Sequence, residues 1–323
     1  MAHAFDPELA PWVDQLRPAD YRDVPAARAQ MSALFSARPP VAVPESVRIR
    51  DLIARTEDAE VDVPVRVYAP ADRPGPFPAL LYVHGGGFVL GDLDMVHAKM
   101  IRFAELGIVV VSVDYRLAPE HPFPAGLHDC FAALRWMVDR AGELAVDSTR
   151  VGVAGDSAGG AIAAGLALLA RDRGGPGVSF QLLDFPATDD RLRTPSATAY
   201  DDTPNVDGPS LRVIWEHYLG VAPGGADVSP YAAVARATDL SGLPPAYIST
   251  SQFDPVRDDG IDYAQRLAHA AVPVELHLYP GTFHGSGLVA GAAVSVRAAA
   301  DQLAALRRGL GVNEAVAQGV STP

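Results

Sequence analysis

A serine flanked by glycines is the first feature that indicates chemistry. Gly155-Asp156-Ser157-Ala158-Gly159-Gly160 contains the pattern Gly-x-Ser-x-Gly, between an apolar run, Val151–Ala154, and a stretch of small residues. Between a strand and a helix, this pattern is typical of a nucleophile elbow, a sharp turn that exposes the serine. Side chains two positions before and after the serine would collide with neighbouring backbone, and both positions are glycine. We therefore predict Ser157 as a nucleophile for acyl transfer; the competing interpretation is a tight turn with a buried serine.

A second glycine-rich segment, His84-Gly85-Gly86-Gly87-Phe88, follows another apolar run, Ala79–Val83. Glycines let a backbone come close to a ligand and turn its amides inward. We predict that amides of Gly85, Gly86 and Gly87, together with that of Ala158, form an oxyanion hole. His84 is expected to support the loop. A plain glycine-rich loop and a phosphate cradle are the alternatives, but the glycine spacing of phosphate-binding loops does not occur here.

A serine nucleophile needs a base and an acid that orients the base, and folds with this elbow order them Ser, Asp or Glu, His. Of nine histidines, only His284 follows every predicted strand. Asp254 comes shortly after the apolar run Ala246–Thr250. We therefore predict Ser157, Asp254 and His284 as a catalytic triad. Asp254 before Pro255 would also make a good helix N-cap, and the alternative for His284 is a histidine in a surface loop.

Apolar runs alternate with helical segments from about residue 78 to residue 309, which predicts an α/β fold with a mostly parallel sheet flanked by helices. Nearly continuous apolar runs are typical of parallel strands covered on both faces. The last run alternates, so it is expected near the sheet edge, and two earlier alternating runs, Val47–Ile53 and Val63–Ala69, are expected to be antiparallel. The predicted strands are Ala79–Val83, Ile108–Val113, Val151–Ala154, Phe180–Phe185, Ala246–Thr250 and Val274–Tyr279. The predicted helices are Met95–Leu106, Leu127–Arg140, Ala158–Arg173, Pro255–Ala271 and Ser295–Arg308.

The composition excludes several classes of partner. The chain has 323 residues and a formal net charge of −13, which argues against binding to nucleic acid or to anionic membranes. No apolar stretch is long enough to span a bilayer, and the first residues lack the pattern of a signal peptide. The single cysteine, Cys130, allows no internal disulfide and permits a cytoplasmic location, which we expect.

Five ordered motifs resemble one family. They are His84-Gly85-Gly86-Gly87-Phe88, Asp114-Tyr115-Arg116-Leu117-Ala118-Pro119-Glu120, Gly155-Asp156-Ser157-Ala158-Gly159-Gly160, Asp254-Pro255-Val256-Arg257-Asp258 and His284-Gly285. Together they resemble the bacterial hormone-sensitive-lipase-like esterases of the α/β-hydrolase superfamily, over about residues 45–310. The resemblance implies the same triad and oxyanion hole, and a carboxylesterase for short- to medium-chain acyl esters. It also implies no metal or cofactor, an N-terminal cap, and a homodimer in many members. Ser286 and Phe253 depart from the family pattern.

On this basis we expect an N-terminal cap segment (1–45), an α/β-hydrolase domain (46–310) with a second cap segment inserted at about 187–235, and a flexible tail (311–323). Ligands of open α/β sheets bind beyond the carboxyl ends of the strands, where inserted segments are placed to cover them. The alternative is that both segments are peripheral loops. Expected pocket residues, each of which also fits core or cap packing, are Leu90, Phe185, Trp215, Phe253 and Leu288.

Other functions fit parts of the same pattern. An amidase or peptidase would use the same triad, although no large extra domain or anchor for a peptide terminus is visible. A non-catalytic small-molecule receptor on this fold typically lacks the base, whereas His284 is present. A hydrolase with an aspartate nucleophile is disfavoured because serine occupies the elbow.

Overall fold

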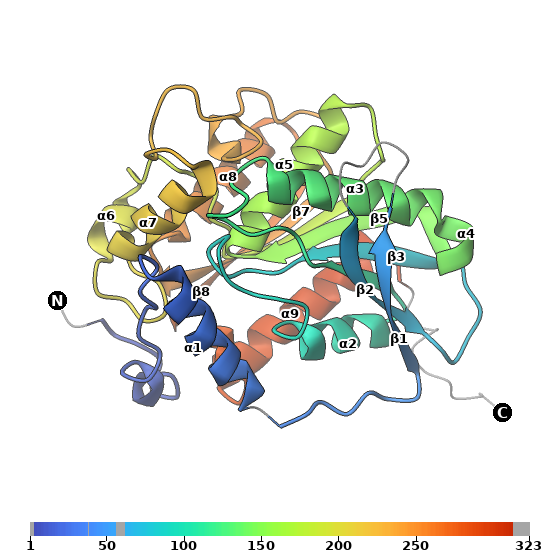
Figure 1. Cartoon of the computed structure of the whole chain (residues 1–323), viewed down its shortest axis with the longest axis horizontal. Helices are drawn as coiled ribbons and strands as arrows, with labels where there is room; N and C mark the ends of the chain where they lie inside the picture. The colour runs from blue at the N-terminus through green and yellow to red at the C-terminus, as the bar shows by residue number, and fades with distance from the viewer. Residues whose placement is uncertain (1–2, 38, 56–61, 313–323) are drawn as a thin grey trace.

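Eight strands form one sheet in the order β1-β2-β4-β3-β5-β6-β7-β8 (Figure 1). The computed structural model describes residues 3–37, 39–55 and 62–312, so most of the expected tail lies outside the described residues. The strands are Val47–Ala54 (β1), Val63–Pro70 (β2), Phe77–Val83 (β3), Val109–Val113 (β4), Val146–Asp156 (β5), Phe180–Asp184 (β6), Ala246–Phe253 (β7) and Val274–Phe283 (β8).

The pairing confirms the predicted fold class. The strands β4, β3, β5, β6, β7 and β8 are parallel, whereas β1 pairs with β2 and β2 pairs with β4 in antiparallel fashion. The alternation of apolar and polar residues in Val274–Tyr279 correctly predicted that β8 lies at an edge of the sheet. The apolar run Val151–Ala154 is only the centre of β5, which begins at Val146 and continues through four partly or fully exposed residues, 147–150. These residues lie outside the two-sided core, so hydrophobicity alone did not reveal them.

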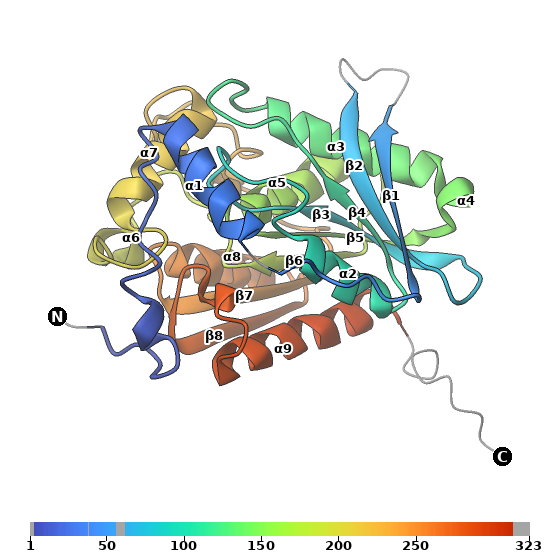
Figure 2. The same cartoon turned by 60° about the horizontal axis from the view of Figure 1, so that its bottom comes forward.

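Helices cover both faces of the sheet (Figures 1 and 2). On one face α3, α5 and α8 pack against the sheet, and on the other face lie α2 and α9. The main helices are α1 (Val24–Ser36), α2 (His97–Glu105), α3 (Ala125–Asp139), α5 (Ala158–Asp172), α7 (Gly208–Leu219), α8 (Arg257–His269) and α9 (Ala293–Gly309). The short helices are α4 (Ala141–Leu144) and α6 (Pro195–Ala199), with 3₁₀ turns at Ala10–Trp12, Val234–Arg236 and Ser286–Leu288.

The small side chains of α5 allow it to lie deep in the molecule. Almost every residue from Ala158 to Ala170 is buried, because this helix packs between the sheet and α3. Gly165 faces the main-chain carbonyl of Tyr231 so closely that a Cβ atom would overlap it. The helix that follows Ser157 is therefore held rigidly, and its N-terminus has a fixed place at the edge of the sheet.

Two segments outside the sheet lie together beyond the carboxyl ends of the strands. Figures 1 and 2 show α1 beside α7, which belongs with α6 to the insertion between β6 and β7. Arg28 of α1 donates from Nε to the carbonyl of Val89 (2.8 Å) and from Nη1 to Glu120 (2.8 Å). His217 of α7 is hydrogen-bonded to the carbonyl of Tyr21 at 2.9 Å. The N-terminal segment is thus joined both to the sheet loops and to the insertion.

Candidate active site

Ser157 stands at the junction of β5 and α5 with φ 54° and ψ −119°, a conformation that L-residues rarely adopt. Its N–H donates to the carbonyl of Asp184 at 2.9 Å, which fixes the turn against β6. A Cβ atom on Gly155 would overlap the carbonyl of Gly159, and one on Gly159 would overlap the carbonyl of Val83. The two glycines of the pattern are therefore required by close backbone packing around the strained serine.

His284 and Ser157 come together although they are 127 positions apart in the sequence. Nε2 of His284 lies 2.8 Å from Oγ of Ser157, and Nδ1 lies 2.8 Å from Oδ2 of Asp254. His284 and Asp254 are both buried. The ring of Phe185 meets the imidazole edge to face, with centroids 4.9 Å apart. In the neutral tautomer that donates from Nδ1 to the carboxylate, Nε2 is free to accept the serine proton.

Asp254 is distinguished from the two carboxylates that follow it. Its Oδ1 accepts the N–H of Val256 at 2.9 Å, so it closes a turn ahead of α8 and does not act as the N-cap itself. Asp258 pairs with Arg257 and accepts the N–H of Ser196 at 2.8 Å. Asp259 accepts two main-chain N–H groups of the 188–189 loop, and burial raises its pKa well above the ordinary value. Only Asp254 contacts the imidazole.

The glycine loop faces Ser157 with its backbone. Gly86 and Gly87 have φ values of 115° and 62° and line the same cavity as Ser157. Among the described residues, no protein acceptor is found for the N–H groups of Gly86, Gly87 and Ala158. Free amides beside a helix N-terminus are suited to stabilise negative charge.

His84 supports this loop from behind. It is completely buried, its Nδ1 lies 2.7 Å from the carbonyl of Gly85, and its ring stacks on Tyr115 with centroids 4.5 Å apart. The hydroxyl of Tyr115 donates to the carbonyl of His84 at 3.0 Å. Burial lowers the pKa of His84, which keeps the ring neutral.

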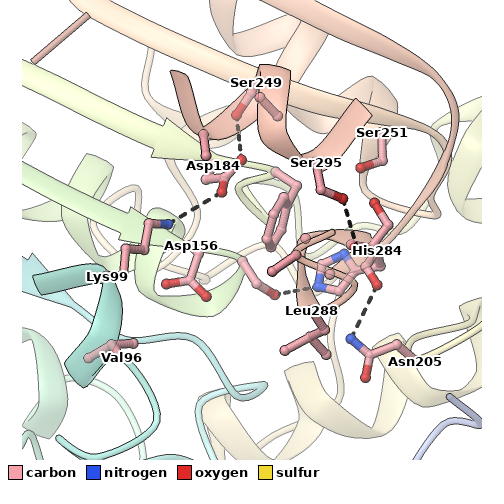
Figure 3. Close-up of a pocket in the computed structure, with 18 of the residues that line it drawn as sticks. Val96, Lys99, Asp156, Asp184, Asn205, Ser249, Ser251, His284, Leu288 and Ser295 are labelled. Atoms are coloured by element: carbon pink, nitrogen blue, oxygen red, sulfur yellow. Dashed lines mark hydrogen bonds and ion pairs between the residues drawn. The ribbon is translucent and has the colours of Figure 1, made fainter. Parts of the chain in front are cut away.

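A cavity of about 370 Å³ opens over these groups (Figure 3). Ser157, His284 and the glycine loop lie on one wall, and both predicted cap segments contribute to the others. Residues of α1 and the insertion that line it are Met31, Leu34, Phe35, Asn205 and Val206.

Comparison with known proteins identifies the family. The sequence pattern of the family described as alpha/beta hydrolase fold matches residues 80–288. The chain belongs to this family, among its hormone-sensitive-lipase-like esterases. Carboxylesterase NlhH of Mycobacterium tuberculosis is 45% identical over 298 residues, which cover 89% of this chain and 90% of that protein. Esterase LipI of the same organism is 44% identical over 240 residues, which cover 72% of this chain and 74% of LipI.

Solved structures agree. A bacterial heroin esterase superposes with a TM-score of 0.92 at 48% identity, and the match covers 95% of this chain and 98% of that one. The present α/β hydrolase is accordingly a carboxylic ester hydrolase of the serine esterase family.

The cavity of this hydrolase corrects part of the predicted pocket. Phe185 and Leu288 line it, whereas Leu90 and Trp215 are completely buried in the core. Phe253 also lies away from the cavity, since its ring packs against Phe5 with centroids 5.3 Å apart, in a cluster that includes His3 and Tyr200. Leu90, Trp215 and Phe253 pack against residues that are distant in sequence. A local sequence pattern therefore could not show that they lie outside the pocket.

Sequence reasoning missed several residues that line the cavity. Asp184 ends β6, Ser249 lies beside it in the middle of β7, and Lys99 of α2 lines the same cavity. The carboxyl ends of parallel strands meet at one edge, so the position of Asp184 at the end of its strand did carry a usable signal. Asn205 and Tyr21, which come from the two cap segments, carried no such signal.

The described residues hold no cluster of three or more His, Cys, Asp or Glu side chains arranged to bind a metal ion. Within the same residues, no helix has both the length and the apolar character needed to cross a membrane.

Proposed function

We propose that Ser157, His284 and Asp254 are the nucleophile, base and orienting acid of this carboxylesterase. The observation that carries the proposal is the unbroken chain of hydrogen bonds from Asp254 through His284 to Ser157, with 2.8 Å at each step. Such a chain is the arrangement that activates a serine hydroxyl, which is a weak nucleophile on its own.

In the first step His284 accepts the proton of Ser157 while Oγ attacks the ester carbonyl. The oxyanion develops beside the N–H groups of Gly86, Gly87 and Ala158. Gly85, which was also predicted for the oxyanion hole, does not line the cavity, and its carbonyl is hydrogen-bonded to His84. The N–H groups are in position before substrate arrives, so no reorganisation is needed when charge develops. Collapse of the tetrahedral intermediate releases the alcohol, which takes the proton from His284, and leaves an acyl-enzyme on Ser157.

Water then repeats the sequence on the acyl-enzyme. His284 accepts a proton from the attacking water and returns it to Ser157 as the acid leaves. Asp254 holds the imidazole in the required tautomer throughout and stabilises the imidazolium. A cavity of about 370 Å³ lies near the small end of ligand pockets, which supports short- to medium-chain acyl esters as substrates.

The decisive experiment compares Ser157→Ala with Ser148→Ala, an exposed serine near the other end of the same strand. Hydrolysis of p-nitrophenyl butyrate is expected to vanish in the first variant and to stay at the wild-type level in the second. A fluorophosphonate probe should label wild-type protein on Ser157 only. Near-normal turnover by Ser157→Ala would refute the assignment. Equal rates with butyrate ester and butyranilide would favour the amidase alternative.

We propose that residues 1–45 and 187–235 act as a cap. The proposal is supported by cavity walls that both segments contribute and by burial of their apolar side chains against the esterase core, as for Val24, Leu211 and Ile214. Replacing Met31 and Leu34 with serine is expected to raise KM for p-nitrophenyl hexanoate more than KM for the acetate, because a longer chain contacts more of the cap. Equal changes for both esters would contradict a cap that contacts substrate.

We infer that a second copy of the chain covers the β8 edge. An exposed edge strand presents unpaired N–H and C=O groups, and here Leu276 and Leu278 are 41% and 48% exposed. Val296 of α9 adds another exposed apolar side chain. Sedimentation is expected to give a dimer for the wild type and a monomer for Leu278→Arg. A monomeric wild type would overturn this inference without touching the triad.

A further inference from the structure

The cavity extends from Ser157 to the space between α2 and α9, where a group of polar side chains lines it beside apolar ones. Sheet register explains its composition, because Asp156 pairs with Asp184 across β5 and β6, and Asp184 pairs with Ser249 across β6 and β7. Their side chains therefore form a row on one sheet face beside the reactive serine. We define the polar arm by six residues that line the cavity, Lys99, Asp156, Asp184, Ser249, Ser251 and Gln302.

The charges in the polar arm do not balance. Asp184 accepts a bond from the hydroxyl of Ser249 at 2.5 Å and lies 3.5 Å from Nζ of Lys99 (Figure 3). Asp156 accepts a bond from the hydroxyl of Tyr82 at 2.5 Å and has no cationic partner among the described residues. Arg102, one turn further along α2, also lines the cavity, but it is solvent-exposed, so its charge is largely screened. Two carboxylates therefore face one partly buried ammonium group, that of Lys99.

Two polar side chains of the arm lack any partner. Ser251 and Gln302 are each 6% exposed and line the cavity, and among the described residues neither side chain has a hydrogen-bond partner. Both side chains line the cavity, so their polar atoms are free to hydrogen-bond a ligand there. A ligand with hydrogen-bonding groups would use them, whereas an unbranched lipid chain would not.

We propose that the polar arm binds a protonated amine carried by one half of the ester substrate. An ammonium group donates hydrogen bonds, which suits Asp156, the oxygen of Gln302 and the hydroxyl of Ser251. It also neutralises the unpaired carboxylate, and charge-assisted hydrogen bonds are the strong ones. This inference rests on the proposed function, since it specifies the substrate of the same site.

The test uses pairs of esters that have the same shape and differ in charge. One pair has the amine on the alcohol half, 2-(dimethylamino)ethyl acetate against 3-methylbutyl acetate. The other has it on the acyl half, ethyl 4-(dimethylamino)butanoate against ethyl 5-methylhexanoate. At neutral pH the wild type is expected to favour the amine in one pair by about tenfold in kcat/KM. The pair that responds identifies which half enters the arm.

Two variants change the preference in opposite directions. Asp184→Asn removes one negative charge, so the preference for the amine should fall about tenfold, whereas Lys99→Met removes the competing cation and should raise it. The double variant should return towards the wild-type preference. In each variant the neutral ester reports any general loss of folding or catalysis.

The outcomes separate this inference from the triad assignment. Hydrolysis of both members of each pair at equal rates, unchanged by either variant, would overturn the polar-arm proposal and leave the esterase mechanism intact. Hydrolysis of neither member would instead count against the proposed function itself.

Discussion

The side-chain amide of Asn205 donates a hydrogen bond to the main-chain carbonyl of His284 at 3.2 Å. The N–H of the same asparagine donates to the carbonyl of Leu16 at 2.5 Å. Asn205 has a φ of 65°, a value that asparagine tolerates better than most residues. One residue of the insertion therefore joins the N-terminal segment to the loop that carries the proposed base.

Asn205→Gly is expected to lower kcat about fivefold with little change in KM. Glycine adopts the positive φ without strain, so the variant removes only the hydrogen bond to His284, whose net value is about 1 kcal/mol. Steady-state kinetics on p-nitrophenyl butyrate measures the effect. Thr203→Val is the matched control, because it removes the neighbouring bond from the Thr203 hydroxyl to the carbonyl of Val206 without touching His284. Equal kinetic losses in the two variants would argue that Asn205 acts only through the fold of the insertion.

Gly159→Ala is expected to abolish activity and to lower the melting temperature by several degrees. The added Cβ would overlap the carbonyl of Val83 and crowd that of His84, so either α5 or the glycine loop must move. Gly177→Ala is the control, since no atom lies within 4 Å of its Cβ position. The control should keep the melting temperature and the rate of ester hydrolysis of the wild type. An active, stable Gly159→Ala enzyme would refute the account of the elbow.

Asp254→Asn should reduce kcat by about 10³–10⁴, because an amide favours the wrong tautomer of the base. Asp258→Asn should cost far less, since Asp258 holds Arg257 and the N–H of Ser196 and makes no contact with His284. Parallel kinetics on the two purified variants makes the comparison. A greater loss in Asp258→Asn would move the role of the acid to that residue.

The ion pair that anchors α1 is expected to make stability depend on pH. Hydrogen bonds from Arg28 lower the pKa of Glu120 from 4.5 to about 2. A lowered folded-state pKa stabilises the protein fully above the unfolded value, and this contribution is lost as pH falls from about 4.5 towards 2. Urea unfolding should therefore give a higher free energy of unfolding for the wild type than for Glu120→Gln at neutral pH. This difference in free energy should become smaller below about pH 4.5. Glu143→Gln, which breaks an exposed pair with Arg140, is the control. A difference in the free energy of unfolding that becomes larger in acid would contradict this interpretation.

The sheet and its main helices were predictable because their signals are local. Continuous apolar runs marked the buried parallel strands, and alternation marked β1, β2 and β8. Ser157 and the glycine loop were equally predictable, since each needs small residues at fixed offsets around a turn. Asp254 and His284 followed from the order in which the strands end.

The residues that line the cavity could not be predicted from local patterns in the same way. Leu90 and Trp215 are apolar residues close to motifs, but long-range packing takes them into the core. Asn205 and Tyr21 reach the cavity only because two segments far apart in sequence dock together. Residues of this kind depend on tertiary contacts that no local pattern encodes.

The docking of the N-terminal segment on the last strand has a consequence for synthesis of the protein. Asp6 donates its N–H to the carbonyl of Gly281, and Leu9 packs against Phe283 beside the base. Asp6 is therefore synthesised 275 residues before its partner Gly281 (281 − 6 = 275). Such long-range closure is slow and comes late, so a nascent chain holds its nucleophile before it holds a finished site. Hydrolytic activity is thus acquired only after β8 and the loop that carries His284 have been synthesised.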